Sequence, residues 1–165
     1  MSARGERARA YFMQGYSCSQ SVAAAFAPEL GLTEEQALRM ASGFGAGFGR
    51  MREVCGTFSG LTLVIGTLYG RPDPAGKGEI YARIQDLAAQ FKARSGGSIV
   101  CRELLGLSQA EGSPVPQQRT AEYYRKRPCP DLVEMAAELV ESYLETHPRE
   151  AVSPADPGQT PPKGL

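Results

Sequence analysis

The apolar residues of this chain recur at intervals of three and four positions, which is the spacing of one face of an α-helix. After a short charged segment at residues 3–13, the pattern predicts core helices that begin near residues 17, 33, 52, 80, 98 and 130. No segment alternates apolar and polar residues with the period of a strand. We therefore expect an all-α fold, a compact multi-helix bundle of about five to six helices.

Three local signals mark where helices start. Ser17 is typical of an N-cap, which would place Cys18 at the first helical position. Residues 33–36, Thr-Glu-Glu-Gln, match a capping box, in which two side chains satisfy free backbone donors. Pro130 suits the first position of the last helix, because proline lacks the N–H that would be unpaired there.

The segment at residues 42–60, SGFGAGFGRMREVCGTFSG, has the most unusual composition, with glycine at every second position from Gly43 to Gly49. These glycines fit neither G-x-G-x-x-G nor G-x-x-x-x-G-K-[ST], and no predicted strand precedes them. Two interpretations stay open. The loop is a tightly folded connection between helices, or its glycine amides hold a small anion together with Arg50 and shape the approach to Cys55.

Two further glycines fall inside the third predicted helix, which should begin near residues 52–53. Gly56 and Gly60 are four positions apart and so share one helix face. Each costs about 1 kcal/mol in helix propensity relative to alanine. We therefore expect a flat strip there, on which another backbone packs closely.

Length and composition indicate a single domain. With 165 residues, of which 42% are hydrophobic, the chain can build one core but is short for two ordinary domains. We place a helical, cysteine-containing domain at residues 1–147. Residues 148–165 are Pro-rich and lack apolar periodicity, so we expect a disordered tail.

Charge and hydropathy narrow the class of protein. The chain has 18 basic and 18 acidic residues, which argues against a nucleic-acid partner. Its most apolar run, residues 54–69, is shorter than the roughly 20 residues that span a bilayer, so no membrane insertion is expected. The N-terminus has no apolar secretory segment, and a cytoplasmic location follows as the default. In a reducing compartment, four cysteines are typical of thiols, metal ligands or redox groups.

Each of the four cysteines, Cys18, Cys55, Cys101 and Cys129, is expected at or near the start of a helix. The positive end of a helix lowers the pKa of a thiol, and Arg50 and Arg52 precede Cys55. Helices that alternate in direction would bring several of these cysteines to one end of a bundle.

Three functions fit this pattern. The first is thiol–disulfide chemistry or electron transfer through the four cysteines, with Cys55 as the attacking thiolate, Arg50, Arg52, Gly49 and Gly56 as stabilising or anion-binding residues, and a redox protein or a small-molecule disulfide as partner. The second is a zinc or iron–sulfur site with Cys18, Cys55, Cys101 and Cys129 as ligands, although no C-x-x-C pair is present. The third is a helical interaction module with inert, buried cysteines.

The sequence also resembles a known family. The segments that carry the resemblance are GYSCSQSV around Cys18, residues 41–60, VCRELLG around Cys101 and RPCPDLVEMAAELV around Cys129. They are similar to the C_GCAxxG_C_C family, whose members are described as redox-active proteins. The family pattern centres on C-G-A-x-x-G, and Thr57 stands here in place of its alanine. The resemblance covers nearly the whole chain apart from the tail, and it implies redox chemistry without naming a substrate.

Overall fold

A computed structural model describes residues 2–109 and 112–149 of the chain. In that part the α-helices are α1 (Ala3–Met13), α2 (Cys18–Ala25), α3 (Glu34–Ala41), α4 (Gly56–Tyr69), α5 (Lys77–Ser95), α6 (Cys101–Leu104), α7 (Ala121–Lys126) and α8 (Cys129–Thr146), with 3-10 turns η1 (Ser42–Phe44) and η2 (Pro74–Gly76). The predicted all-α class is confirmed, with eight α-helices in the described residues rather than five to six. Most of the expected tail, residues 150–165, lies outside the described residues.

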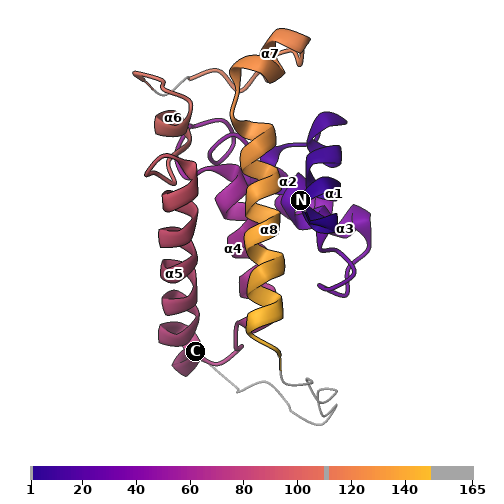
Figure 1. The fold of residues 1–165 in the computed structure, drawn as a ribbon, viewed down its shortest axis with the longest axis vertical. Helices are drawn as coiled ribbons and strands as arrows, with labels where there is room; N and C mark the ends of the chain where they lie inside the picture. The colour runs from indigo at the N-terminus through magenta and orange to yellow at the C-terminus, as the bar shows by residue number, and fades with distance from the viewer. Residues whose placement is uncertain (1, 110–111, 150–165) are drawn as a thin grey trace, which may run out of the picture.

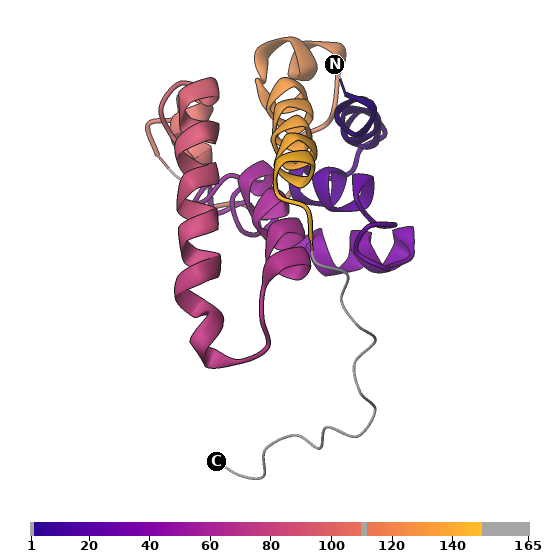
Figure 2. The same ribbon diagram turned by 60° about the horizontal axis from the view of Figure 1, so that its bottom comes forward.

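The longest helices form the body of the molecule, and α8 lies between α1 and α5 in both views (Figures 1 and 2). α4 packs against α2, α5 and α8, and so occupies the middle of the fold. α4 and α8 both start at the end of the molecule where α5 finishes and α6 follows (Figure 1). That end carries the helix starts on which the candidate chemistry depends.

The core is made of the apolar helix faces that the periodicity predicts. Its largest fully buried side chains include Phe12, Phe26, Leu61, Ile65 and Phe91. Phe91 of α5 meets Phe58 of α4 edge to face, with ring centroids 5.4 Å apart. Among the described residues, no helix is both long and apolar enough to cross a membrane.

Two of the predicted helix starts are confirmed in detail. Ser17 accepts from the backbone N–H of Gln20, whose side chain accepts in return from the Ser17 N–H at 3.0 Å. The same reciprocal capping box is present between Thr33 and Gln36. Both boxes fix the point at which a helix leaves its loop, so Cys18 is the first residue of α2 as expected.

Several helix starts differ from prediction. α5 begins at Lys77 rather than near residue 80, and α6 begins at Cys101, with Val100 as its N-cap, rather than near residue 98. α4 begins at Gly56, after Cys55, rather than near residues 52–53, because the chain up to Arg52 is held in left-handed backbone conformations. α8 begins at Cys129, one residue earlier than expected, with Pro130 at its second position. α7 was not predicted; its N-cap Thr120 accepts from Tyr123 N–H at 3.2 Å.

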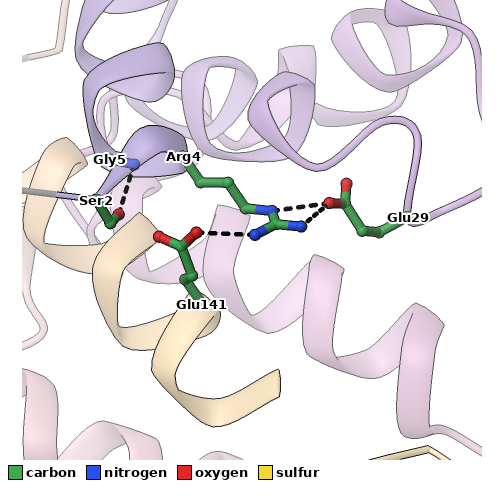
Figure 3. Close-up of polar contacts among 5 residues, drawn as sticks. All are labelled: Ser2, Arg4, Gly5, Glu29 and Glu141. Carbon is green, nitrogen blue, oxygen red and sulfur yellow. Dashed lines mark hydrogen bonds and ion pairs between the residues drawn. The ribbon is translucent and has the colours of Figure 1, made fainter. Parts of the chain in front are cut away.

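A partly buried cluster of charges ties α1 to the rest of the fold. The Arg4 guanidinium lies between two carboxylates and donates to Glu29 and, at 2.8 Å, to Glu141 of α8 (Figure 3). The side chains are only partly exposed, 32% for Arg4 and 16% for Glu141. Ser2 caps α1 beside them by accepting from the Gly5 N–H. These contacts fix the N-terminal helix against the long C-terminal one.

The glycine strip of α4 permits the close helix packing that the sequence predicts. A Cβ on Gly60 would lie 2.9 Å from the backbone oxygen of Ser19 and 3.0 Å from Val22 in α2, whereas a Cβ on Gly66 would meet no atom within 4 Å. We expect Gly60→Ala to destabilise the fold by about 1–3 kcal/mol, the cost of overpacking. Gly66→Ala, its control on the same helix, should stabilise by up to about 1 kcal/mol. Urea unfolding measures both, and equal effects would contradict the close packing.

Candidate functional site

All four cysteines line one small cavity of about 60 Å³ at the end of the molecule where α2, α4, α6 and α8 begin. Cys18, Cys101 and Cys129 are the first residues of their helices, and Cys55 is the N-cap of α4. None of the four is in a disulfide, and Cys55 and Cys101 are only 5% and 6% exposed. The fold therefore brings together thiols that lie up to 111 residues apart, 129 − 18, in the sequence.

A short antiparallel bridge positions two of the thiols. Val54 pairs with Val100, the Cys55 N–H donates to the carbonyl of Ile99 at 2.7 Å, and the Cys101 N–H donates to Glu53 at 2.6 Å. The bridge fixes the start of α4 beside the start of α6, which places Cys55 and Cys101 in the same wall of the cavity. A single bridge is too short to produce the alternation of apolar and polar residues that indicates a strand, so it was not predicted from the sequence.

The other two thiols, Cys18 and Cys129, form a coupled pair. Hydrogen bonding between the two side chains raises the pKa of Cys18 well above its ordinary value, with burial adding to the rise. The same hydrogen bond lowers the pKa of Cys129, with a smaller contribution from the positive charge of Arg127. The two thiols therefore titrate as a coupled pair, in which Cys129 is the more acidic member.

Two features of position favour Cys129 over Cys18 as the more acidic thiol of that pair. Cys129 begins α8, an 18-residue helix, whereas Cys18 begins the 8-residue α2. Pro130 follows Cys129 and Arg127 precedes it by two residues, so the anion lies at the positive end of a long helix and near a fixed positive charge. A thiolate is the nucleophilic form of cysteine, so the lowered pKa makes Cys129 the candidate nucleophile of the cavity.

The expected low pKa of Cys55 is wrong. Burial raises the pKa of this thiol to about 12, and the hydroxyl of Thr57 only partly opposes the rise. The two arginines expected beside it point elsewhere. Arg52 is buried and its Nη1 donates to Cys101 Sγ at 3.9 Å, while Arg50 donates to the carbonyl of Ser113. A pKa-lowering charge is therefore not among the causes found for Cys55 in the described part of the chain, although both arginines lie near it in the sequence.

Cys101 is close to a charge but remains a weak acid. Burial raises its pKa, and the hydrogen bond from Arg52 opposes that rise without reversing it.

The two glycines predicted as site residues, Gly49 and Gly56, lie in different places. Gly56 lines the thiol cavity, where an added Cβ would come within 2.9 Å of the Phe44 carbonyl oxygen. Gly49 lies outside it, in a neighbouring groove.

Sequence reasoning missed the residue that anchors the mouth of the cavity, Arg119. Its guanidinium donates to the carbonyls of Phe12 at 2.7 Å and Tyr16 at 2.9 Å, and it lies 4.1 Å from the centre of the Phe12 ring. The guanidinium carbon also lies 5.5 Å from the centre of the Tyr123 ring in α7. The residue lies in a predicted loop, and no local pattern there indicates that it reaches back across the sequence to the end of α1.

Thr57, which departs from the family pattern, faces the thiols from the second position of α4. It is fully buried, and its hydroxyl makes no hydrogen bond of regular geometry among the described residues. The Thr57 hydroxyl interacts instead with the thiols of Cys18 and Cys55. In both cases it opposes the rise in pKa that coupling between the thiols and burial cause. An alanine could not do this, so the hydroxyl is a feature of this chain's own cavity.

The metal alternative gains no support from this geometry. Within residues 2–109 and 112–149, no three side chains of the types cysteine, histidine, aspartate and glutamate are arranged so that they could hold a metal ion. The four cysteines line one cavity without meeting that condition. The arrangement is that of a thiol pocket with arginines at its edge.

Comparison with known proteins agrees with this class of site. Residues 16–143 match the sequence profile of a family described as "Putative redox-active protein (C_GCAxxG_C_C)", and the match includes all four cysteines. The chain belongs to the C_GCAxxG_C_C family. A search of curated proteins and a search of solved structures each found no match.

Proposed function

We propose that this protein carries out thiol–disulfide exchange, with Cys129 as the attacking thiolate and Cys18 as the thiol that resolves the mixed disulfide. The observation that carries the proposal is the meeting of Cys18 and Cys129 in one cavity at the starts of α2 and α8, where hydrogen bonding between the two side chains lowers the pKa of Cys129 and raises that of Cys18. Membership of a family described as redox-active supports the same class of chemistry. Cys55, the nucleophile expected from the sequence, is replaced in this role because its thiol is buried and protonated.

The reaction balances with a disulfide as the oxidant. The Cys129 thiolate attacks one sulfur of the disulfide, the S–S bond breaks, and the departing half leaves as a thiolate that accepts the proton of Cys18. The Cys18 thiolate then attacks the sulfur of Cys129 in the mixed disulfide and releases the second half. Two electrons pass from the protein to the substrate, two small thiols are formed, and a Cys18–Cys129 disulfide remains to be reduced by another thiol.

The remaining groups of the cavity support this pair. α2 packs directly against α8, and the thiols at the starts of both helices line the same cavity. Arg127 and Arg119 supply positive charge near Cys129 and Cys18 respectively, which stabilises each thiolate as it forms. Cys55 and Cys101 line the same cavity, and their raised pKa values favour the protonated thiol.

Oxidation followed by mass mapping tests the proposal. Purified, reduced protein is treated with diamide, alkylated under denaturing conditions and digested; we expect two thiols to be lost together in a Cys18–Cys129 cross-linked peptide. Cys55→Ser should still form this cross-link, whereas Cys18→Ser exposed to a small disulfide should accumulate a mixed disulfide on Cys129. A cross-link between other cysteines, no loss of thiols, or stoichiometric zinc or iron that shields all four thiols would overturn the proposal.

A further inference from the structure

The size of the thiol cavity limits which oxidants fit inside it. Its volume of about 60 Å³ is well below the roughly 300–1,000 Å³ that is usual for sites holding a drug-sized ligand. A water molecule needs about 10–15 Å³ of such space, so the cavity has room for a few water-sized groups. Cys18 and Cys129 each keep part of their surface exposed to solvent. A molecule of two heavy atoms can therefore meet both thiols within the cavity.

Two guanidinium groups line this cavity together with the thiol pair. Arg119 donates to two backbone carbonyls, and Arg127 donates to the side-chain amide oxygen of Gln117. These partners are neutral, so they orient the two side chains without cancelling their charge. The charges reach the sulfurs, because Arg127 contributes to the lowered pKa of Cys129 and Arg119 opposes the rise in the pKa of Cys18.

The remaining walls of the cavity increase the effect of these groups. Leu104, Leu105 and Leu132 line it, and none of its described lining residues is an aspartate or a glutamate. Hydrogen bonds and charges act more strongly in apolar surroundings than in water. A guanidinium carries five N–H donors, of which the two carbonyls take two in Arg119. The cavity thus combines a nucleophilic thiol with donors suited to a small molecule that carries oxygen.

We propose that a small peroxide is a further oxidant of this protein, and that Cys129 breaks its O–O bond inside the thiol cavity while Arg119 and Arg127 donate to its oxygens. This inference rests on the thiol pair of the proposed function and adds hydrogen peroxide, or a hydroperoxide of similar size, as a substrate class. Positioned donors stabilise the negative charge that develops on the departing oxygen.

The reaction balances with the peroxide as the electron acceptor. The Cys129 thiolate attacks one oxygen of hydrogen peroxide and becomes a sulfenic acid, while the other oxygen leaves as hydroxide and takes the proton of Cys18 to form water. The Cys18 thiolate then attacks the sulfur of Cys129, and the second hydroxide leaves and takes a proton from solvent. Two electrons pass from the thiol pair to the peroxide, and two waters and one disulfide are formed.

A size series of peroxides tests the inference. Reduced protein in a buffer with a metal chelator is mixed with hydrogen peroxide, tert-butyl hydroperoxide or cumene hydroperoxide, and the loss of thiols is followed in the folded protein and in urea. We expect hydrogen peroxide to react about 100-fold or more faster with the folded protein than with the unfolded one. Cumene hydroperoxide should react at least about tenfold more slowly than hydrogen peroxide with the folded protein. Equal rates in either comparison would overturn the cavity as the site of reaction.

Trapping the intermediate identifies the reacting sulfur. In Cys18→Ser, which lacks the resolving thiol, hydrogen peroxide followed by dimedone should label Cys129 as the sulfenic acid. In the wild type the same treatment should give a Cys18–Cys129 disulfide and little label. Dimedone found on Cys55 or Cys101 in place of Cys129 would overturn the proposal.

Matched variants test the arginines. The readout is the ratio of the hydrogen peroxide rate to the iodoacetamide rate, because both reactions need the thiolate and the ratio cancels its amount. Arg119→Gln and Arg127→Gln should each lower this ratio by about tenfold or more. Arg39→Gln, which removes an exposed arginine paired with Glu35 on α3, should keep the wild-type ratio.

A wild-type ratio in a folded Arg127→Gln, or an equal fall in Arg39→Gln, would overturn the role of the arginines, and circular dichroism shows which variants are folded. The two proposals can fail separately. If diamide forms the Cys18–Cys129 disulfide and hydrogen peroxide does not, only the inference on peroxide fails. If neither oxidant forms that disulfide, the proposed function fails with it.

Discussion

Replacing Cys129 with serine is expected to remove the fast reaction of this protein with iodoacetamide at neutral pH, while Cys55→Ser should leave that reaction in place. The Cys129 thiol is partly accessible and its pKa is lowered by Cys18, so it supplies a nucleophilic thiolate. The Cys55 thiol is 5% exposed and its pKa is raised to about 12. At pH 7 a group with that pKa is thiolate in only about one molecule in 10⁵. We expect Cys129 to be alkylated at least about 100-fold faster than Cys55.

The pH dependence of alkylation adds a second readout to the same variants. Because only the thiolate reacts, the wild-type rate should rise with pH and level off once the pH exceeds the pKa of Cys129. This pKa is lowered, so the midpoint of the rise should fall below the pKa of an ordinary cysteine. In Cys18→Ser the hydroxyl replaces the thiol that stabilises the anion, so the same profile should shift toward higher pH. Peptide mapping after brief alkylation assigns the modified residue. Label found first on Cys55, or a wild-type profile centred at or above the ordinary cysteine pKa, would remove Cys129 as the nucleophile.

The helix starts, and with them the common placement of the cysteines, could be read from the sequence because their signals are local. Ser17 and Gln20 cap α2 through side chains three residues apart, and Thr33 and Gln36 do the same for α3. The apolar period of α8 likewise lies within one segment. Such patterns require only neighbouring residues, and they predicted that Cys18 begins a helix.

The chemistry of the individual thiols could not be predicted in the same way, because burial and pairing depend on distant segments. Cys55 has glycine and two arginines near it in sequence, yet it is buried under the bridge to Val100 and its pKa rises. Cys18 and Cys129 come from opposite parts of the chain and meet only when α2 packs on α8. The arginine at the mouth, Arg119, is positioned by carbonyls about 100 residues away.

The conformation of the Gly-rich loop could be predicted from the sequence less well than that of any helix. Its backbone has positive φ at every residue from Ala46 to Arg50 and again at Arg52, a left-handed path that includes four residues other than glycine. Such conformations cost roughly 1–2 kcal/mol for each residue with a side chain. Backbone hydrogen bonds compensate, for example from the N–H of Gly49 to Gly43 and from the N–H of Glu53 to Gly47. This left-handed path brings Arg50 to the groove beside the thiol cavity and Arg52 to the cavity itself.

Gly47→Ala is therefore expected to cause the largest loss of stability among single substitutions in this loop, and Gly49→Ala provides its control. Both glycines are left-handed, with φ of 76° and 56°, so alanine at either position carries a backbone cost of roughly 1–2 kcal/mol. They differ in surroundings. A Cβ on Gly47 would lie 2.7 Å from the Glu53 nitrogen and 2.8 Å from the Arg52 Cα, whereas a Cβ on Gly49 would meet no atom within 4 Å.

Because the atoms that obstruct Gly47→Ala belong to the backbone, they cannot move aside as a flexible side chain would, and the loop must shift as a unit. We expect a further cost of about 1–3 kcal/mol, so Gly47→Ala should lose roughly 2–5 kcal/mol in urea unfolding against roughly 1–2 kcal/mol for Gly49→Ala. The shift would also displace Arg52 from Cys101 Sγ, which it now reaches at 3.9 Å, so the pKa of Cys101 should rise further in Gly47→Ala and its alkylation at alkaline pH should slow. Equal losses of stability in the two variants would show that the close approach of residues 47 and 52 does not hold the loop, and that the thiol cavity is positioned by the bridge between Val54 and Val100 alone.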